Sequence, residues 1–177
     1  MDTLRDFIDA DLTVLSIGIN PSLHAVRAGF PFAFPRNRFW PALNASSLVG
    51  ESFTPGIPAT ERLLKAYRFG FTDVVKLPSA SASVLRAKDY ADAAPALVEK
   101  IRLATPSVLW FHGKTAIDGF CRYLDGGRRD SRWGLQDFDL FETPCFVSPN
   151  PSPANAGYSL ARIVASYDEL ANYLNPI

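Results

Sequence analysis

The tripeptide Asn-Pro-Ser occurs twice in the chain, at residues 20–22 and 150–152. Each copy follows a short apolar run, which predicts a loop at the end of a buried strand. Proline restrains the residue before it to extended conformations, so each asparagine is held on a stiff backbone. One copy alone is typical of a tight turn. Two copies at matching strand ends indicate a built site that presents two amide side chains to a ligand.

Residues 29–40 (GFPFAFPRNRFW) place aromatic rings among prolines and arginines. Phe32 is a candidate for stacking on a nucleobase, an interaction worth ~1–3 kcal/mol. The other aromatic residues of this segment are expected in the core: Phe30, Phe34, Phe39 and Trp40. Arg36 and Arg38 are candidates for phosphate contacts, and the alternative is that they are solvated surface residues.

Short apolar runs predict strands at residues 13–19, 70–75, 107–111 and 145–148. Helical spacing predicts helices at 38–48, 60–68, 89–104, 114–123 and 159–174, with Thr60 near a helix cap and Pro95 in the first turns of its helix. Residues 78–83 (PSASAS) predict a mobile loop. Strands that alternate with helices favour a three-layer α/β sandwich with a short, mainly parallel, four-stranded sheet. In such folds the ligand binds beyond the carboxyl ends of the strands.

The length of 177 residues suits a single domain over residues 1–177, with residues 1–11 as an N-terminal extension. Eighteen basic and 18 acidic residues give a net charge of zero, so binding to DNA would require basic groups gathered on one face. No apolar run reaches the ~20 residues of a membrane span, and the N-terminus lacks the pattern of a signal peptide. The two cysteines and two histidines do not predict a metal site. We expect a cytoplasmic monomer without metal, cofactor or membrane contact.

Two further features are interpreted without a catalytic role. His112 lies at the end of a predicted strand, where a ligand contact is possible, but a core or rim histidine is the commoner case. Arg128, Arg129 and Arg132 form a basic run that either touches a phosphate backbone or is a solvated turn, and the second interpretation is favoured.

Three motifs in this order and at these spacings resemble one known family: GINPS at 18–22, GFPFAFPRNRFW at 29–40 and NPSPAN at 150–155. They look like the mismatch-specific uracil/thymine-DNA glycosylases, the second family of the uracil-DNA glycosylase superfamily. The resemblance extends to FGFTDVV at 69–75, FHGK at 111–114 and RWGLQ at 132–136. It runs from about residue 12 to the end of the chain, and the first two motifs in tandem are highly specific.

The resemblance implies a uracil-DNA glycosylase-like fold and a monofunctional DNA glycosylase that acts in base excision repair on uracil in double-stranded DNA. G·U mismatches are the expected context, with single-stranded DNA or other contexts as further ones. Such an enzyme hydrolyses the N-glycosidic bond of a flipped base without metal or cofactor. By this resemblance Asn20 positions the attacking water and Phe32 stacks on the base. The other residues implied to bind substrate are Gly18, Ile19, Pro21, Ser22, Asn150 and Ser152. The loop implied to enter the duplex comprises Pro153, Ala154, Asn155 and Ala156.

The sequence departs from the family pattern at three positions. Asp73 stands where better-known relatives carry lysine or asparagine, and a carboxylate there can orient or deprotonate water and stabilise a cationic sugar. The alternative is that Asp73 caps a strand end or pairs with Lys76. Ala154 is small for a side chain that fills the gap left by a flipped base. Ser22 replaces a glycine and puts acceptance of thymine in doubt.

Two other functions remain open at this point. The first is a glycosylase of the same fold that prefers a deaminated purine, such as hypoxanthine or xanthine. The second is a module that binds a nucleotide or damaged DNA without cleavage. Release of a free base distinguishes the first from the second, because only an enzyme produces it.

Overall fold

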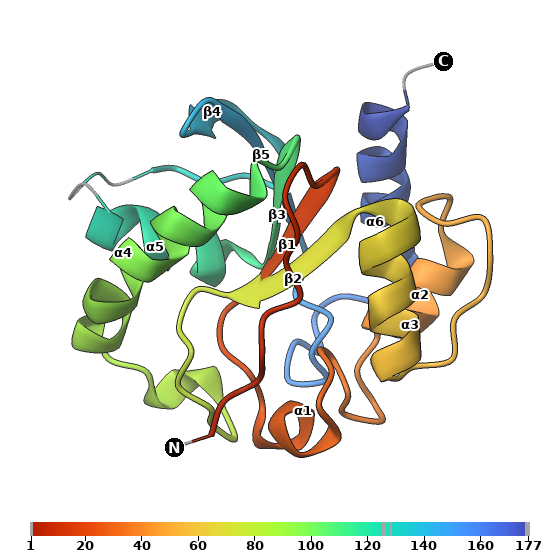
Figure 1. The fold of residues 1–177 in the computed structure, drawn as a ribbon, viewed down its shortest axis with the longest axis horizontal. Helices are drawn as coiled ribbons and strands as arrows, with labels where there is room; N and C mark the ends of the chain where they lie inside the picture. Colours follow the sequence, from red (N-terminus) through yellow and green to blue (C-terminus); the bar gives the residue numbers. More distant parts are fainter. Residues whose placement is uncertain (1, 125–126, 128, 176–177) are drawn as a thin grey trace.

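A mixed sheet of five strands lies at the centre of the computed structural model, which describes residues 2–124, 127 and 129–175 (Figure 1). The strands are β1 (Val14–Gly18), β2 (Phe69–Asp73), β3 (Val108–His112), β4 (Gly134–Leu140) and β5 (Thr143–Ser148). Their order across the sheet is β2-β1-β3-β5-β4. The first four strands in this order are parallel, and β4 is antiparallel to β5. The predicted α/β fold with a mainly parallel sheet is confirmed.

Helices cover both faces of this sheet. They are α1 (Leu23–Ala28), α2 (Phe39–Ala45), α3 (Ile57–Arg62), α4 (Ala87–Ala104), α5 (Lys114–Leu124) and α6 (Leu160–Leu174). A π-helical turn (Leu63–Tyr67) extends α3, and a 3-10 turn (Ala82–Val84) precedes α4. Helices α4 and α5 pack together on one face, whereas α2 and α6 pack together on the other (Figure 1). No helix in the described part of the chain is long and apolar enough to cross a membrane.

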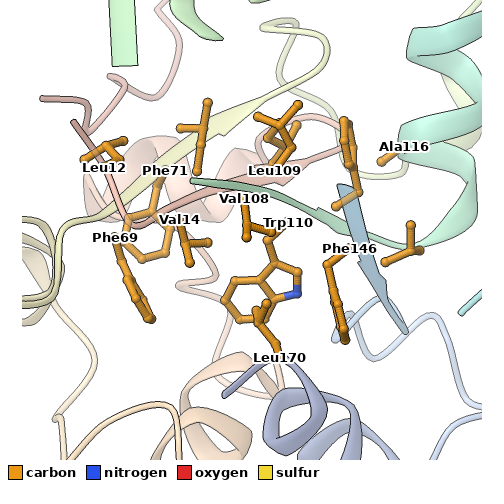
Figure 2. Packing of buried hydrophobic residues seen from close by; sticks show 14 of the residues in the cluster. Leu12, Val14, Phe69, Phe71, Val108, Leu109, Trp110, Ala116, Phe146 and Leu170 are labelled. Atoms are coloured by element: carbon orange, nitrogen blue, oxygen red, sulfur yellow. The ribbon is translucent and has the colours of Figure 1, made fainter. Parts of the chain in front are cut away.

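The central strands are buried on both faces, which explains their continuous apolar runs. Figure 2 shows Trp110 of β3 directed toward Leu170 of α6, with Leu109 on the opposite face of the strand. Because side chains alternate along a strand, His112 lies on the same face as Trp110. Ser16 of β1 pairs in register with Trp110 and shares this face. The α6 side of the sheet therefore carries polar side chains at its carboxyl edge.

The fifth strand, β4, corrects the prediction of a four-stranded sheet. Strands β1, β2, β3 and β5 correspond to the four predicted apolar runs. Strand β4 is an edge strand in which buried and exposed residues alternate, so its sequence GLQDFDL contains no apolar run. Its pairing with β5 is also irregular between Leu135 and Asp139. Half-exposed edge strands give a weaker sequence signal than buried ones.

Three helix predictions need correction. The helix predicted at 60–68 begins at Ile57, and Thr60 lies inside it, where its hydroxyl donates to the carbonyl oxygen of Gly56, the actual N-cap residue. The helix predicted at 89–104 begins at Ala87, which places Pro95 in its interior rather than in its first turns. The helix predicted at 38–48 is shorter, because α2 begins only after Arg38 and ends at Ala45.

The N-terminal segment, predicted as an extension, is attached to the free edge of β2. The backbone N–H and C=O of Phe7 both bond to Phe71, in an antiparallel bridge with N···O distances of 3.0 and 2.8 Å. Leu4 and Phe7 are buried. The segment therefore covers part of an edge strand that would otherwise present unpaired backbone groups to solvent.

Candidate active site

A cavity of about 580 Å³ opens at the carboxyl ends of β1, β2 and β3, next to the loop that follows β5. Most of the residues predicted for the site line it: Gly18, Ile19, Asn20, Pro21, Ser22, Phe32, Asp73, Asn150, Ser152, Ala154 and Asn155. Pro153 and Ala156 belong to the same loop but do not line the cavity. Three segments that lie far apart in the sequence thus meet at one edge of the sheet.

Asn20 is held in one orientation by the loop at residues 77–81. Its Nδ2 donates to the carbonyl oxygen of Leu77 at 2.7 Å and to Ser79 Oγ at 2.8 Å. Because a carbonyl oxygen can only accept, the contact with Leu77 fixes which end of the amide is the nitrogen. The backbone N–H of Ser79 donates to Pro21, which ties this loop to the Asn-Pro-Ser turn. Neither side-chain bond uses Asn20 Oδ1, the atom that can accept from a water.

Phe32 lies on the cavity wall in an unusual backbone conformation. Its φ is +57°, a left-handed value that residues other than glycine rarely adopt. Residues in such conformations cluster at functional sites. One face of its ring stacks on Phe39, with centroids 4.1 Å apart and planes 15° apart. The predicted core location is confirmed for Phe39 and Trp40, which are buried. Phe30 and Phe34, also predicted in the core, are only partly buried.

Asp73 lies directly beside Gly18, its partner in the pairing of β1 and β2. A Cβ atom added to Gly18 would lie 2.7 Å from Asp73 Oδ1, so a larger residue at position 18 would displace the carboxylate. Asp73 Oδ2 lies 3.4 Å from Lys76 Nζ. Burial raises the pKa of Asp73, while the positive charge of Lys76 acts in the opposite direction. The carboxylate therefore pairs with Lys76, as one predicted alternative has it, and it also lines the cavity.

Asp6, which the sequence did not mark, shares Lys76 with Asp73. Its carboxylate lies 2.9 Å from Lys76 Nζ and 2.7 Å from Lys100 Nζ, and it accepts a bond of 2.7 Å from Thr72 Oγ1. Burial acts to raise the pKa of Asp6, but the two lysines and the hydroxyl outweigh it and lower the pKa. Lys76 is closer to Asp6 than to Asp73, so it neutralises the Asp73 carboxylate only in part.

The side chain of Arg38 is bonded to the loop after β5, a role that neither predicted alternative (phosphate contact or solvated surface residue) included. Its guanidinium donates to the backbone carbonyls of Ser152 and Asn155, each at 2.8 Å, and to that of Tyr158. Its Nε also reaches the carbonyl of Pro151 at 3.3 Å. These contacts are side chain to backbone over more than 110 residues, and no local pattern could reveal them. Arg36 stays exposed, with its Cζ 5.6 Å from the centroid of the Phe34 ring.

Asn150 and Ser152 shape the same loop by local bonds. Asn150 Oδ1 accepts from the backbone N–H of Ser152 at 2.9 Å, and Ser152 Oγ accepts from that of Ala154 at 3.3 Å. Asn155 Nδ2 donates to the carbonyl of Asn150 at 3.0 Å. Ala154 and Ala156 are left exposed at the tip. The second Asn-Pro-Ser motif is thus a rigid turn that also borders the cavity.

His112, for which sequence analysis allowed a ligand contact, forms a buried polar pair with Ser16, which sequence analysis did not mark. Ser16 Oγ lies 2.8 Å from His112 Nε2, and both residues line the cavity. Burial lowers the pKa of His112 to about 3, so the ring is neutral near pH 7. The pair joins two neighbouring strands and is 96 residues apart in sequence, which leaves no motif to find.

The basic run of Arg128, Arg129 and Arg132 does not reach the cavity through its described members. Arg129 Cζ lies 5.6 Å from the centroid of the Phe138 ring, and Arg132 Nε donates to the carbonyl of Leu135 at 2.9 Å. Arg128 lies outside the described residues. Lys114 and Trp133 border the cavity instead, with the ammonium 5.1 Å from the indole centroid.

The cavity offers a carboxylate, an oriented amide and an aromatic ring, which suit attack of water on a sugar whose base is stacked. Within the described residues, no group of three or more histidine, cysteine, aspartate or glutamate side chains is placed to hold a metal ion.

The model of the Uracil DNA glycosylase superfamily matches residues 5–175. The chain belongs to this superfamily. Membership implies a DNA substrate.

A solved structure supports the same fold for this superfamily member. The chain is similar to the solution NMR structure of a candidate uracil DNA glycosylase from Methanosarcina acetivorans, with a TM-score of 0.66 and 19% sequence identity. The match covers 97% of this chain and 96% of the other. At this identity the likeness concerns the fold alone.

Proposed function

We propose that the protein is a monofunctional DNA glycosylase of the mismatch-specific type, which hydrolyses the N-glycosidic bond of uracil flipped out of a duplex. The observation that carries the proposal is the meeting of Asn20, Phe32 and Asp73 in one cavity from three separate segments. Each has the chemistry that this reaction requires. Asp73 is the last residue of β2, whereas Asn20 and Phe32 lie in the segment that follows β1.

The reaction breaks the bond between C1′ of the sugar and a nitrogen of the base. Its electron pair leaves with the base, and the sugar becomes an oxocarbenium-like cation that water attacks at C1′. Asn20 Oδ1 accepts from this water and positions it, because the amide nitrogen is already engaged. Asp73, when ionised, stabilises the cation and takes a proton from the water. Backbone N–H groups of Ile19, Asn20 and Ser22 stabilise the anionic base.

Phe32 continues an aromatic stack in this proposal. One face of its ring already lies on Phe39, and the base stacks on the opposite face. The Pro153–Ala156 loop enters the duplex, and its exposed alanines lie at the tip of a turn that Arg38 holds in place. Gly18, Ile19, Pro21 and Ser22 border the base, and Asn150 with Ser152 borders the sugar and phosphate.

The test is single-turnover excision on labelled duplexes with G·U, A·U, G·T or hypoxanthine·T, and on single-stranded DNA with uracil. We expect release of uracil from the G·U duplex by the wild type. Asn20→Ala is expected to slow it about 100-fold or more, since it removes the group that positions water. Asp73→Asn is expected to slow it less, because the isosteric amide keeps the shape of the site.

Two exposed residues give matched controls. Asn172→Ala on α6 and Asp92→Asn on α4 make the same chemical changes away from the cavity, and both are expected to leave the rate unchanged. Faster release of hypoxanthine than of uracil would favour the deaminated purine as substrate. Tight DNA binding with no free base from any substrate would overturn the proposal and favour a binding module.

A further inference from the structure

A buried nitrogen on the cavity wall lacks a partner. Ser16 and His112 are each 1% exposed, and the Ser16 hydroxyl occupies only Nε2 of the imidazole. Nδ1 of His112 is buried and has no hydrogen-bond partner among the described residues. Buried ring nitrogens are normally paired, because water no longer solvates them. Because His112 is also one of the residues that line the cavity, its unpaired Nδ1 points to a ligand that pairs with it.

The imidazole lies alongside the aromatic stack of Phe32 and Phe39. Its centroid is 4.9 Å from that of Phe32 and 5.7 Å from that of Phe39, and both rings are steeply inclined to it. A ring positioned beside a stack meets the edges of its members rather than their faces. A base stacked on the face of Phe32 opposite Phe39 would therefore have His112 beside its edge.

The neutral imidazole can present either a donor or an acceptor at Nδ1. If Ser16 donates to Nε2, the ring proton is on Nδ1, and if Nε2 donates to Ser16, then Nδ1 is an acceptor. The buried bond to Ser16 survives in both tautomers. Uracil and hypoxanthine both carry an N–H next to a C=O, so each offers a partner for either form.

We propose that His112 is a further base-binding residue, whose Nδ1 hydrogen-bonds the N–H or C=O edge of the flipped deaminated base while Ser16 holds the ring. This inference rests on the proposed function and deepens it, because it adds the group that contacts the edge of the base. The same contact would serve a deaminated pyrimidine and a deaminated purine alike, because both present an N–H next to a C=O.

Two substitutions separate contact with the base from support of the fold. In His112→Asn the short side-chain amide takes the place of Nδ1, whereas in His112→Gln the longer amide reaches the place of Nε2 and Ser16. Single-turnover rates on the G·U duplex are measured at saturating enzyme, with thermal melting of each free variant. We expect His112→Asn to stay within about threefold of the wild type and His112→Gln to lose about tenfold. The reverse order, with His112→Gln near wild type, would show that the bond to Ser16 is all that matters and would overturn the inference.

A second measurement works even if neither variant folds. The chain has two histidines, and His24 is exposed, so ¹⁵N-histidine spectra of the wild type are readily assigned with His24→Gln. Free uracil added to a complex with abasic duplex is expected to shift the Nδ1 resonance of His112. An unchanged Nδ1 resonance at saturating uracil would overturn the inference. If the wild type releases no base at all, the proposed function fails first, and the two failures are thereby distinguished.

Discussion

Replacement of Arg38 by methionine tests whether one side chain holds the loop after β5. The substitution keeps most of the apolar stem and removes the donors to the carbonyls of Ser152, Asn155 and Tyr158. The carbonyl of Pro151 keeps the backbone N–H of residue 38 as a donor at 3.0 Å. Bonds from a charged donor contribute ~1.5–3 kcal/mol each, but carbonyls at the surface regain water. We expect the free energy of unfolding to fall by about 2–4 kcal/mol, roughly one or two such bonds.

Urea unfolding followed by fluorescence measures this loss, and Arg36→Met provides the matched control. Arg36 is exposed on the same segment and bonds to no loop carbonyl, so its replacement is expected to change stability by less than about 0.5 kcal/mol. The loop borders the cavity, so Arg38→Met is also expected to slow excision from a G·U duplex about tenfold or more. Arg38→Lys keeps the charge but not the planar fork and is expected to recover only part of both losses.

Two results would refute this reasoning. If Arg38→Met unfolds within about 0.5 kcal/mol of the wild type, the carbonyl bonds do not stabilise the loop. If Arg36→Met is as destabilised as Arg38→Met, the loss comes from surface charge rather than from the bonds of Arg38 to the loop. An effect on DNA affinity confined to Arg36→Met would instead assign the phosphate contact to Arg36.

Three further predictions concern the carboxylates near the cavity. Burial raises the pKa of Asp73 although Lys76 opposes this, so the rate of excision should fall as pH drops through a pKa above the ordinary range of aspartate. In pH–rate profiles, Lys76→Met should move this fall in rate to higher pH, because it removes the positive charge that lowers the pKa of Asp73. Asp73→Asn should abolish the fall. The pKa of Asp6 is lowered in the fold, so its contribution to stability is present above its unfolded pKa and is lost as pH falls through its folded pKa. Urea unfolding should show Asp6→Asn less stable than wild type at pH 7, and this difference should shrink as pH falls below the ordinary range of aspartate. Gly18→Ala should displace Asp73, lower the single-turnover rate and reduce stability by about 1–3 kcal/mol, and a variant with wild-type rate would contradict the close packing of this pair.

The sequence by itself determined the parts of the fold that depend on local chemistry. Apolar runs marked the four strands that are buried on both faces, since burial on both faces leaves no polar alternation. The Asn-Pro-Ser motifs and the segment at residues 29–40 marked the edge of the sheet where the cavity opens, because proline and glycine fix the backbone locally. Asn20, Phe32 and Asp73 were accordingly predicted from type and position, and the structure brings them to one cavity.

The tertiary structure decided which side chains serve these residues. Asp6 reaches Lys76 across 70 residues, Arg38 reaches the loop after β5 across more than 110, and His112 meets Ser16 across 96. Each pair consists of common residue types without a fixed spacing, so no sequence motif predicts the contact. Strand β4 was missed for a related reason, because an edge strand takes its order from pairing with β5 rather than from its own apolar content. Local propensity thus determines where the helices and strands form. Tertiary packing determines which polar side chains orient the site residues and set the charge around them.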